Sequence, residues 1–379
     1  MSKKFSVIFI IIICILYLLF IPKGRIVTLL GAGATFPYPL IEKWRVKFQE
    51  SYSNITINYR AVGSGGGIRL IIEGLVDFAC SDAPMNEEEY EMAIKKGTIL
   101  HIPFTLGAVV LAYNIPDLNY RIKLTGEIIA DIYLGKISKW NDPAIAALNS
   151  NITLPDEDII VVKRSDSSGT TYIFTDYLSS ISEEWRLRIG KTKIFSFPPE
   201  VGSRGIAQKG NQGVSQAILQ IPYSIGYIEL AYALQNNMST ILIKNADGFF
   251  VEANMTTIKA AAASAAAYLP KGWDFWGNVT IVNAPGKKSY PISSFSYMLV
   301  YAEQRNYEKY LALIKWLNWI NTEGQDYAAE LDYVPIPEEV RELNSESISR
   351  IRFSGFLIVK MCEDFLIDIR RREIYYEVR

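Results

Sequence analysis

Residues 159–171 read Ile-Ile-Val-Val-Lys-Arg-Ser-Asp-Ser-Ser-Gly-Thr-Thr, and this stretch predicts a strand, a tight turn and the start of a helix. The β-branched run favours a strand that ends at Arg164, and a helix is expected over residues 172–178. The first turn of such a helix offers free backbone N–H groups and a positive dipole end, which favour an anion. Arg164 can add a two-pronged hydrogen bond to tetrahedral oxygens. An ordinary turn with Ser168 or Thr170 as helix N-cap is the alternative.

Two further turns of this kind occur earlier, at residues 31–37 and 81–84, and both follow expected strands. Upstream of residue 84 we expect strands at 26–30, 55–59 and 76–80, a helix at 38–52, and a glycine-rich turn at 63–67 that opens a helix over 68–73. Alternating strands and helices predict an α/β fold in which mostly parallel sheets are covered by helices on both sides.

The rest of the chain continues the alternation. Further helices are expected at 123–134, 143–148, 213–219, 260–267 and 310–322, with a glycine-rich loop at 202–213 and a strand at 225–233. The apolar runs 104–113 and 291–301 can carry the chain between two lobes. The expected organisation is therefore an N-terminal segment (1–25), a first lobe (26–111 and 291–341), a second lobe (112–290) and a C-terminal extension (342–379).

Composition describes a globular chain and argues against nucleic acid as a partner. The 379 residues are 49% hydrophobic and 21% charged, with a formal net charge of −1. No broad basic field is therefore available, and any anion site must be built locally from dipoles and a few placed charges.

Cysteine and histidine are too sparse for a metal centre. Cys14, Cys80 and Cys362 form no CxxC motif, so no zinc site or other metal site is predicted. The single histidine, His101, ends an expected strand, and a structural role is favoured over a catalytic one.

The N-terminal segment predicts a membrane attachment. Residues 5–21 carry no charge and follow Lys3 and Lys4, and no Ala-x-Ala cleavage site comes after them. We expect a retained signal anchor with the globular part outside the cell, or a secreted protein if the leader is cleaved. Five sequons agree with an extracytoplasmic location and are candidate glycosylation sites: Asn54, Asn151, Asn237, Asn254 and Asn278.

The C-terminal extension has a pattern of its own. Phe353, Leu357, Met361, Phe365 and Ile369 recur every four residues and are followed by three arginines at 370–372. This spacing predicts a helix, which either packs on the globular domain that precedes it or lies on a membrane or partner with its basic end at lipid headgroups.

Eight motifs follow one another along the chain. They are Gly-Ala-Gly-Ala-Thr-Phe-Pro (31–37), Val-Gly-Ser-Gly-Gly-Gly (62–67), Val-Asp-Phe-Ala-Cys-Ser-Asp-Ala-Pro (76–84), Asp-Ile-Tyr-Leu-Gly-Lys-Ile-Ser-Lys-Trp (131–140), Arg-Ser-Asp-Ser-Ser-Gly-Thr (164–170), Lys-Gly-Asn-Gln-Gly (209–213), Gly-Tyr-Ile-Glu (226–229) and Asp-Tyr-Val-Pro-Ile-Pro (332–337). In this order they resemble the PstS-type substrate-binding proteins of phosphate ABC transporters. The resemblance covers about residues 26–341. It implies a two-lobed type II periplasmic-binding-protein fold with the ligand in the cleft between lobes.

The resemblance also implies a ligand set. The residues that match the family's phosphate ligands are Thr35, Phe36, Ser64, Asp82, Arg164, Ser168, Gly169 and Thr170. Asp166 can hold the guanidinium of Arg164 in place. No cofactor and no catalytic residue is implied.

Asp82 is the residue expected to discriminate between anions. A carboxylate only accepts hydrogen bonds, so it pairs with a phosphate that carries a proton and not with sulfate, which carries none. A buried Asp82 facing sulfate would be unpaired, at a cost of about 1–3 kcal/mol or more. A helix cap or turn before Pro84 is the alternative role.

The resulting hypothesis is a monomeric, membrane-tethered, extracytoplasmic receptor that binds inorganic phosphate with high affinity and delivers it to an ABC permease. The alternatives are a phosphate sensor or surface protein acting through its C-terminal tail, a receptor for another tetrahedral oxyanion, and a surface phosphatase. The phosphatase hypothesis lacks a metal cluster or an activated nucleophile in the sequence.

Overall fold

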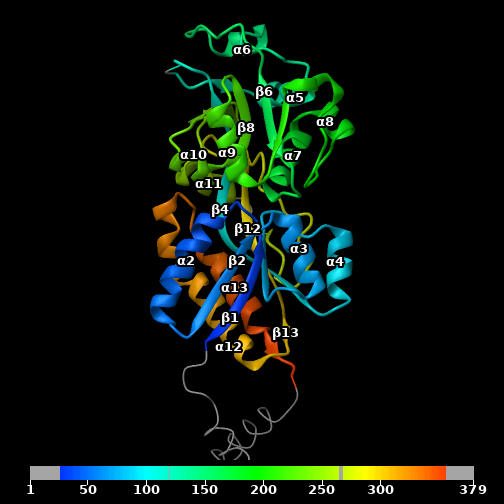
Figure 1. The fold of residues 1–379 in the computed structure, drawn as a ribbon, viewed down its shortest axis with the longest axis vertical. Coiled ribbons are helices and arrows are strands. Elements are labelled where there is room, and N and C mark those ends of the chain that lie inside the picture. Colours follow the sequence, from blue (N-terminus) through cyan, green and yellow to red (C-terminus); the bar gives the residue numbers. More distant parts are fainter. Residues whose placement is uncertain (1–25, 119, 264–267, 356–379) are drawn as a thin grey trace, which may run out of the picture.

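The structure is a computed structural model that describes residues 26–118, 120–263 and 268–355. It has two lobes stacked along the long axis of the molecule (Figure 1). The predicted leader at 5–21 and most of the C-terminal extension lie outside the described residues. Within the described ranges, no helix combines the length and apolar character needed to cross a bilayer.

The lower lobe in Figure 1 contains the N-terminal motifs and the C-terminal helices. Its main strands are β1 (Val27–Gly33), β2 (Ile55–Ala61), β3 (Phe78–Ser81) and β12 (Ser293–Tyr301), with the first part of β4 (Ile99–Asn114). Its helices are α2 (Tyr38–Ser51), α3 (Ser64–Glu73), α4 (Glu87–Ile94), α12 (Tyr307–Asn321) and α13 (Glu338–Ser349), with short 3₁₀ turns at Glu323–Tyr327 and Ala329–Leu331.

The upper lobe contains the stretch at 159–171. Its main strands are β6 (Ile160–Arg164), β7 (Gly205–Gln208) and β8 (Ser224–Glu229). Its helices are α5 (Gly126–Leu134), α6 (Pro143–Leu148), α7 (Gly169–Ile181), α8 (Glu183–Arg188), α9 (Gly210–Gln220), α10 (Leu230–Gln235) and α11 (Met255–Ala263), with a 3₁₀ helix at Pro199–Arg204. Small strands complete the fold: β5 (Lys123–Leu124), β9 (Ser239–Thr240), β10 (Leu242–Lys244), β11 (Phe250–Val251), β13 (Glu303–Gln304) and β14 (Arg352–Phe353).

One long strand joins the two lobes into a single sheet path. The order of the main strands is β2-β1-β3-β12-β4-β8-β6-β7. β4 pairs antiparallel with β12 up to Ala108, and from Val109 onward it pairs antiparallel with β8. The pairs β1–β2, β1–β3, β6–β7 and β6–β8 are parallel. The carboxyl ends of β1, β3 and β6 therefore face the junction between the lobes, where helices begin.

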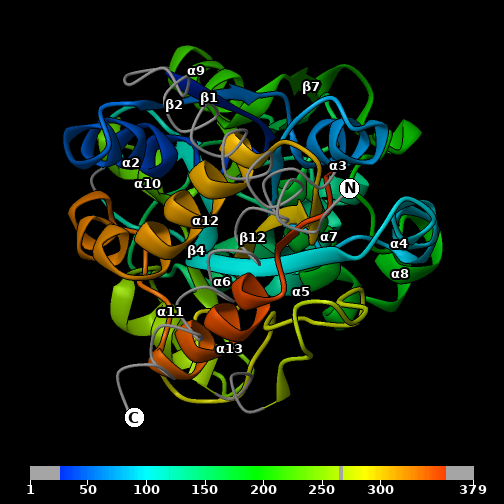
Figure 2. The same ribbon diagram turned by 90° about the horizontal axis from the view of Figure 1, so that it is seen from below.

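The predicted α/β fold with helices on both faces is confirmed. The apolar run at 104–113 lies within β4, which pairs with strands of both lobes, whereas the run at 291–301 contains β12, which pairs with β3 and with the first part of β4 in the lower lobe. All but the last residue of β4 is buried, which explains its nearly continuous apolar sequence. Figure 2 shows α12 lying between α2 and α13 on the lower lobe. Its Trp316 packs edge-on against Phe48 of α2, with ring centroids 5.0 Å apart.

Several element boundaries differ from the predictions for identifiable reasons. Residues 123–124 form a strand, because Thr125 caps α5 by accepting a hydrogen bond from the Ile128 N–H, so the helix starts after it. The strand predicted at 225–233 ends at Glu229, whose side chain caps α10. The glycine-rich segment 202–213 is not a single loop, since it contains β7 and the start of α9.

The C-terminal pattern also requires a correction. Residues 344–349 belong to α13, which packs on α12 and β4, and Asn344 and Ile348 are buried. Phe353 is not helical: it lies in β14, and its ring contacts Tyr307 at a centroid distance of 5.4 Å. The other members of the four-residue repeat lie outside the described residues, as do residues 264–267 of the predicted alanine-rich helix.

His101 has the structural environment that its position in a strand predicts. It is buried in β4, stacks on Trp276 and accepts a hydrogen bond from the Met85 N–H through Nε2 at 3.3 Å. Burial lowers its pKa to about 3, so the imidazole is neutral at physiological pH.

Candidate anion-binding site

Arg164 is a buried cation at the C-terminal end of β6. Its side chain is 1% exposed, and Asp166 accepts hydrogen bonds from Nε at 2.8 Å and from Nη2 at 2.5 Å. Burial opposes the charged form of Asp166, but the hydrogen bonds and charge of Arg164 outweigh it and lower the pKa of that carboxyl. The guanidinium is therefore held in one orientation, with Nη1 donating to Thr170 Oγ1 at 3.2 Å.

The N-terminus of α7 lies beside this arginine. Ser168 is its N-cap, because Ser168 Oγ accepts a hydrogen bond from the Thr171 N–H at 3.1 Å. The Ser168 N–H donates to the Lys193 carbonyl at 2.8 Å, so the hydroxyl is the donor that Ser168 can direct at a ligand. Gly169 and Thr170 are the first two residues of the helix, where backbone N–H groups have no partner within the helix.

Asp82 approaches from the other lobe. It follows β3 and is 1% exposed, and its Oδ1 accepts a hydrogen bond from Ser296 Oγ at 2.8 Å. Ser64, at the start of α3, donates its hydroxyl to Asp82 Oδ2 at 3.3 Å. Burial raises the pKa of Asp82 to about 7, although the Ser296 hydrogen bond and the charge of Arg164 act in the opposite direction.

The turn that contains Thr35 and Phe36 completes the site from the lower lobe. Gly33 has φ +141°, and a Cβ there would lie 2.0 Å from the Cys80 carbonyl oxygen, so this turn requires glycine. Thr35 Oγ1 accepts a hydrogen bond from Asn211 Nδ2 at 3.1 Å, and the Phe36 carbonyl accepts one from Tyr333 Oη at 2.6 Å. Both residues are buried.

The two lobes touch around these groups. The Gly65 N–H of α3 donates to the Ser167 carbonyl at 3.1 Å, and Tyr232 Oη of α10 donates to the Thr35 carbonyl at 2.7 Å. A cavity of about 400 Å³ lies alongside, lined by both lobes, with Tyr38 and Tyr59 on one side and Lys209 on the other. Thr35 and Asp166 line this cavity, so the candidate site lies beside a cleft between the lobes.

The contact between the lobes at Gly65 leaves no room for a side chain. A Cβ there would lie 2.0 Å from Ser167 Oγ and 2.6 Å from Ser167 Cβ, across the lobe boundary. We expect Gly65→Ala to lower ligand affinity about tenfold or more while the protein still folds, since overpacking costs about 1–3 kcal/mol. Calorimetric titration with phosphate measures this.

Gly66→Ala is the matched control, because its Cβ would meet only Val62, within the same lobe. Adding Ser167→Gly to Gly65→Ala removes the clashing atoms and should restore affinity. An unchanged affinity in Gly65→Ala would mean that the ligand is held without this contact between lobes.

The structure brings together all the residues singled out in the sequence. Thr35, Phe36, Ser64 and Asp82 come from the lower lobe, and Arg164, Asp166, Ser168, Gly169 and Thr170 come from the upper lobe. Gly169 is in close contact with the other lobe, since a Cβ on it would lie 2.4 Å from Ser64 Oγ and 2.7 Å from Asp82 Oδ2.

Sequence reasoning missed Ser296 and Asn211. Ser296 lies in β12, more than two hundred residues from Asp82, and no motif marks it. Asn211 lies in the motif at 209–213, in which the sequence assigned this residue no role. The position of Asn211, a polar residue in the first turn of a helix that follows a strand, was the signal that could have identified it as a site residue.

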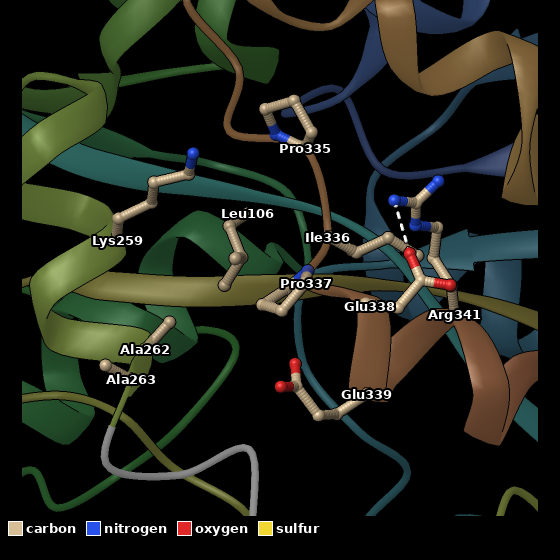
Figure 3. Close-up of a pocket in the computed structure, with 10 residues that line it drawn as sticks. All are labelled: Leu106, Lys259, Ala262, Ala263, Pro335, Ile336, Pro337, Glu338, Glu339 and Arg341. Carbon is tan, nitrogen blue, oxygen red and sulfur yellow. Dashed lines mark ion pairs between the residues drawn. The ribbon is translucent and has the colours of Figure 1, made fainter.

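A second cavity, of about 680 Å³, lies where α11 approaches the segment leading into α13 (Figure 3). It is lined by Leu106, two alanines of α11 and Pro335–Pro337, and Arg341 is paired with Glu338 there. It contains none of the anion-site residues. Among the residues that the structure describes, no group of three or more His, Cys, Asp or Glu side chains is placed to hold a metal ion.

The fold and this cleft define a class: two-lobed proteins that bind a small ligand between their lobes. The family model for the PBP superfamily domain matches residues 22–323. A phosphate-binding protein PstS from Pasteurella multocida is 40% identical over 330 residues, covering 87% of this chain and 92% of that protein. A PstS from Methanocaldococcus jannaschii is 37% identical, covering 87% and 88%.

The chain therefore belongs to the PstS phosphate-binding proteins of the PBP superfamily. A solved structure of a human phosphate binding apolipoprotein has the same fold, with a TM-score of 0.66 at 18% identity, over 84% of this chain and 94% of that one.

Proposed function

We propose that this protein binds inorganic phosphate outside the cytoplasm and delivers it to an ABC permease, without making or breaking a bond. One observation carries the proposal. The buried guanidinium of Arg164 and the N-terminus of α7 face the buried carboxylate of Asp82 across the lobe boundary. Such a site offers several donors together with the Asp82 acceptor, which matches an oxyanion that carries a proton.

The proposed ligands are Thr35, Phe36, Ser64, Asp82, Arg164, Ser168, Gly169 and Thr170. Arg164 provides the cation, the hydroxyls and helix N–H groups provide neutral donors, and Asp82 accepts the phosphate proton. The names of the relatives at 37–40% identity support phosphate as the anion.

The proposal includes a hinge between lobes formed by residues 26–111 with 291–341 and by residues 112–290. The change of partner along β4, from β12 to β8 after Ala108, supports a hinge close to this boundary. Ligand between the lobes would favour the closed arrangement because both lobes contribute hydrogen bonds to it. A permease can then distinguish the loaded closed form from the empty open one.

The proposal also places a monomer at the outer face of the membrane, tethered by residues 5–21. The seventeen uncharged residues of that segment support the tether. The sequons Asn54, Asn151, Asn237 and Asn278 are exposed, whereas Asn254 is partly buried and its Oδ1 accepts the Thr257 N–H at 3.0 Å. Asn254 is therefore the poorest candidate for glycosylation.

Calorimetric titration of the purified full-length protein, first with phosphate and then with sulfate, tests the proposal. We expect one phosphate per chain and sulfate binding at least about a hundredfold weaker, since an unpaired buried charge costs more than 1–3 kcal/mol. Equal binding of both anions would overturn the role of Asp82, and binding of neither would overturn the function. Release of phosphate from an ester substrate would overturn the assignment as a non-enzyme.

A further inference from the structure

Asn211 connects the two lobes at the centre of the site. It is the second residue of α9 and is fully buried. Its side-chain Nδ2 lies 3.1 Å from Thr35 Oγ1 in the lower lobe and 3.2 Å from Thr170 Oγ1 in the upper lobe. Both hydroxyls belong to the proposed phosphate ligands, so one amide group contacts two ligand side chains that are 135 residues apart in sequence.

The orientation of this amide follows from a third contact. The Glu229 N–H, at the end of β8, lies 3.1 Å from Asn211 Oδ1. A backbone N–H can only donate a hydrogen bond, so the group facing it must be the amide oxygen. The NH₂ group of Asn211 must then face Thr35 and Thr170, with one hydrogen for each.

This orientation determines what the two hydroxyls can do. Because Asn211 only donates to them, both threonine oxygens are acceptors in these bonds. Thr35 Oγ1 also accepts the Asn211 backbone N–H at 3.3 Å, and Thr170 Oγ1 also accepts Arg164 Nη1 at 3.2 Å. A hydroxyl oxygen has two lone pairs, so both are occupied in each residue and only the hydroxyl hydrogen remains available.

We propose that Asn211 is a positioning residue that makes Thr35 and Thr170 obligate hydrogen-bond donors toward the bound anion. The inference rests on the proposed function, since these hydroxyls matter only if they face phosphate. It assigns a specificity role to a residue that does not itself touch the ligand. The closed arrangement is favoured by the same amide, because the two acceptors lie on different lobes.

Asn211→Asp tests the direction of these hydrogen bonds, because aspartate has nearly the same shape as asparagine. A carboxylate at this position accepts hydrogen bonds, so it would draw both hydroxyl hydrogens away from the ligand. Asn211→Ala instead leaves the hydroxyls free to rotate toward phosphate. We expect affinity at about pH 8 to fall at least about a hundredfold in the Asn211→Asp variant but only about tenfold in the Asn211→Ala variant, since charged groups raise the cost of unmade hydrogen bonds.

The pH dependence of phosphate affinity in the Asn211→Asp variant distinguishes a reversed hydrogen-bond polarity from a general disruption of the site. At about pH 5.5 the buried carboxyl group introduced by Asn211→Asp is expected to be protonated, so it donates one hydrogen again and recovers part of the lost affinity. Three charged or titratable residues lie close to this amide. Arg164 donates to Thr170, Asp166 accepts the Gly210 N–H, and the backbone N–H of Glu229 donates to the amide itself. Affinity is therefore expressed as the ratio of variant to wild type at each pH, which cancels their titration.

A distant asparagine supplies the matched control. Asn245 is also buried and donates its amide hydrogens only to backbone carbonyls, including that of Gly286 at 3.1 Å. We expect Asn245→Asp to lower thermal stability but to leave phosphate affinity unchanged. If wild type binds phosphate and Asn211→Asp binds it better than Asn211→Ala at about pH 8, the inference about Asn211 is overturned while the proposed function stands. If wild type does not bind phosphate, the proposed function fails and the inference fails with it.

Discussion

Arg164→Ala is expected to reduce phosphate affinity by about a hundredfold to ten-thousandfold, because removal of one partner from a buried charged network costs about 3–5 kcal/mol. The change removes the buried cation and leaves Asp166 as an unpaired carboxylate near the incoming anion. It also removes the donor to Thr170 Oγ1. Calorimetric titration with phosphate measures the loss directly.

Arg164→Lys should restore little of this affinity. Asp166 is held by two guanidinium nitrogens while a third reaches Thr170, and an ammonium group cannot reproduce that planar geometry. Arg188→Ala is the control for loss of a positive charge, since Arg188 is paired with Glu184 and Glu200 on the surface of the upper lobe. An Arg164→Ala protein that folds and binds phosphate like wild type would remove Arg164 from the site.

Asp82→Asn is expected to abolish most of the discrimination between phosphate and sulfate. Asparagine offers an N–H donor to an oxyanion that lacks a proton, so sulfate gains a partner where the carboxylate would repel it. Removing that cost, about 1–3 kcal/mol or more, should raise sulfate affinity about tenfold to a hundredfold. Phosphate affinity should fall, because its own proton loses an acceptor. Competition between the two anions in one titration reports both changes.

The pH dependence follows from the raised pKa of Asp82. Burial raises this pKa to about 7, so the carboxyl is neutral below that pH and charged above it. The neutral acid can donate to sulfate, and we therefore expect wild-type sulfate affinity to increase as the pH falls from about 8 to about 5.5. The Asp82→Asn variant should show no such increase.

Asp77→Asn controls for the loss of a carboxylate from the same lobe. Asp77 immediately precedes β3 and is paired with Lys309, away from the site. It should leave both the selectivity and the pH profile as in wild type. A wild-type sulfate affinity that does not change with pH would mean that Asp82 does not face the anion.

The sequence was informative wherever local chemistry decides structure. The segment 160–170 contains a β-branched strand, a serine cap and a glycine in that order, so its conformation is largely a local matter. Gly33 differs in this respect, because the need for glycine there comes partly from the close approach of the Cys80 carbonyl oxygen, which belongs to the more distant strand β3. The candidate site residues were assigned because the motifs that contain them resemble those of a known family, and most of these residues lie in such turns.

What could not be predicted depends on contacts between distant segments. Ser296 reaches Asp82 only because β12 returns beside β3. The boundary between β8 and α10 is set by the side chain of Glu229, which a strand-like sequence does not reveal. Phe353 fits a helical repeat in sequence but pairs as a strand because β13 provides an edge for it.

The pairing of Arg164 with Asp166 also affects how the protein behaves in environments of different ionic strength. In the proposed site the paired guanidinium of Arg164 and the helix N-terminus would hold the anion through short hydrogen bonds inside a buried environment. Salt screens exposed charges over about 8–10 Å but acts much less on groups withdrawn from water. We therefore expect such a receptor to retain its ligand in brackish or saline surroundings, where a cluster of surface lysines would lose much of its attraction for an anion.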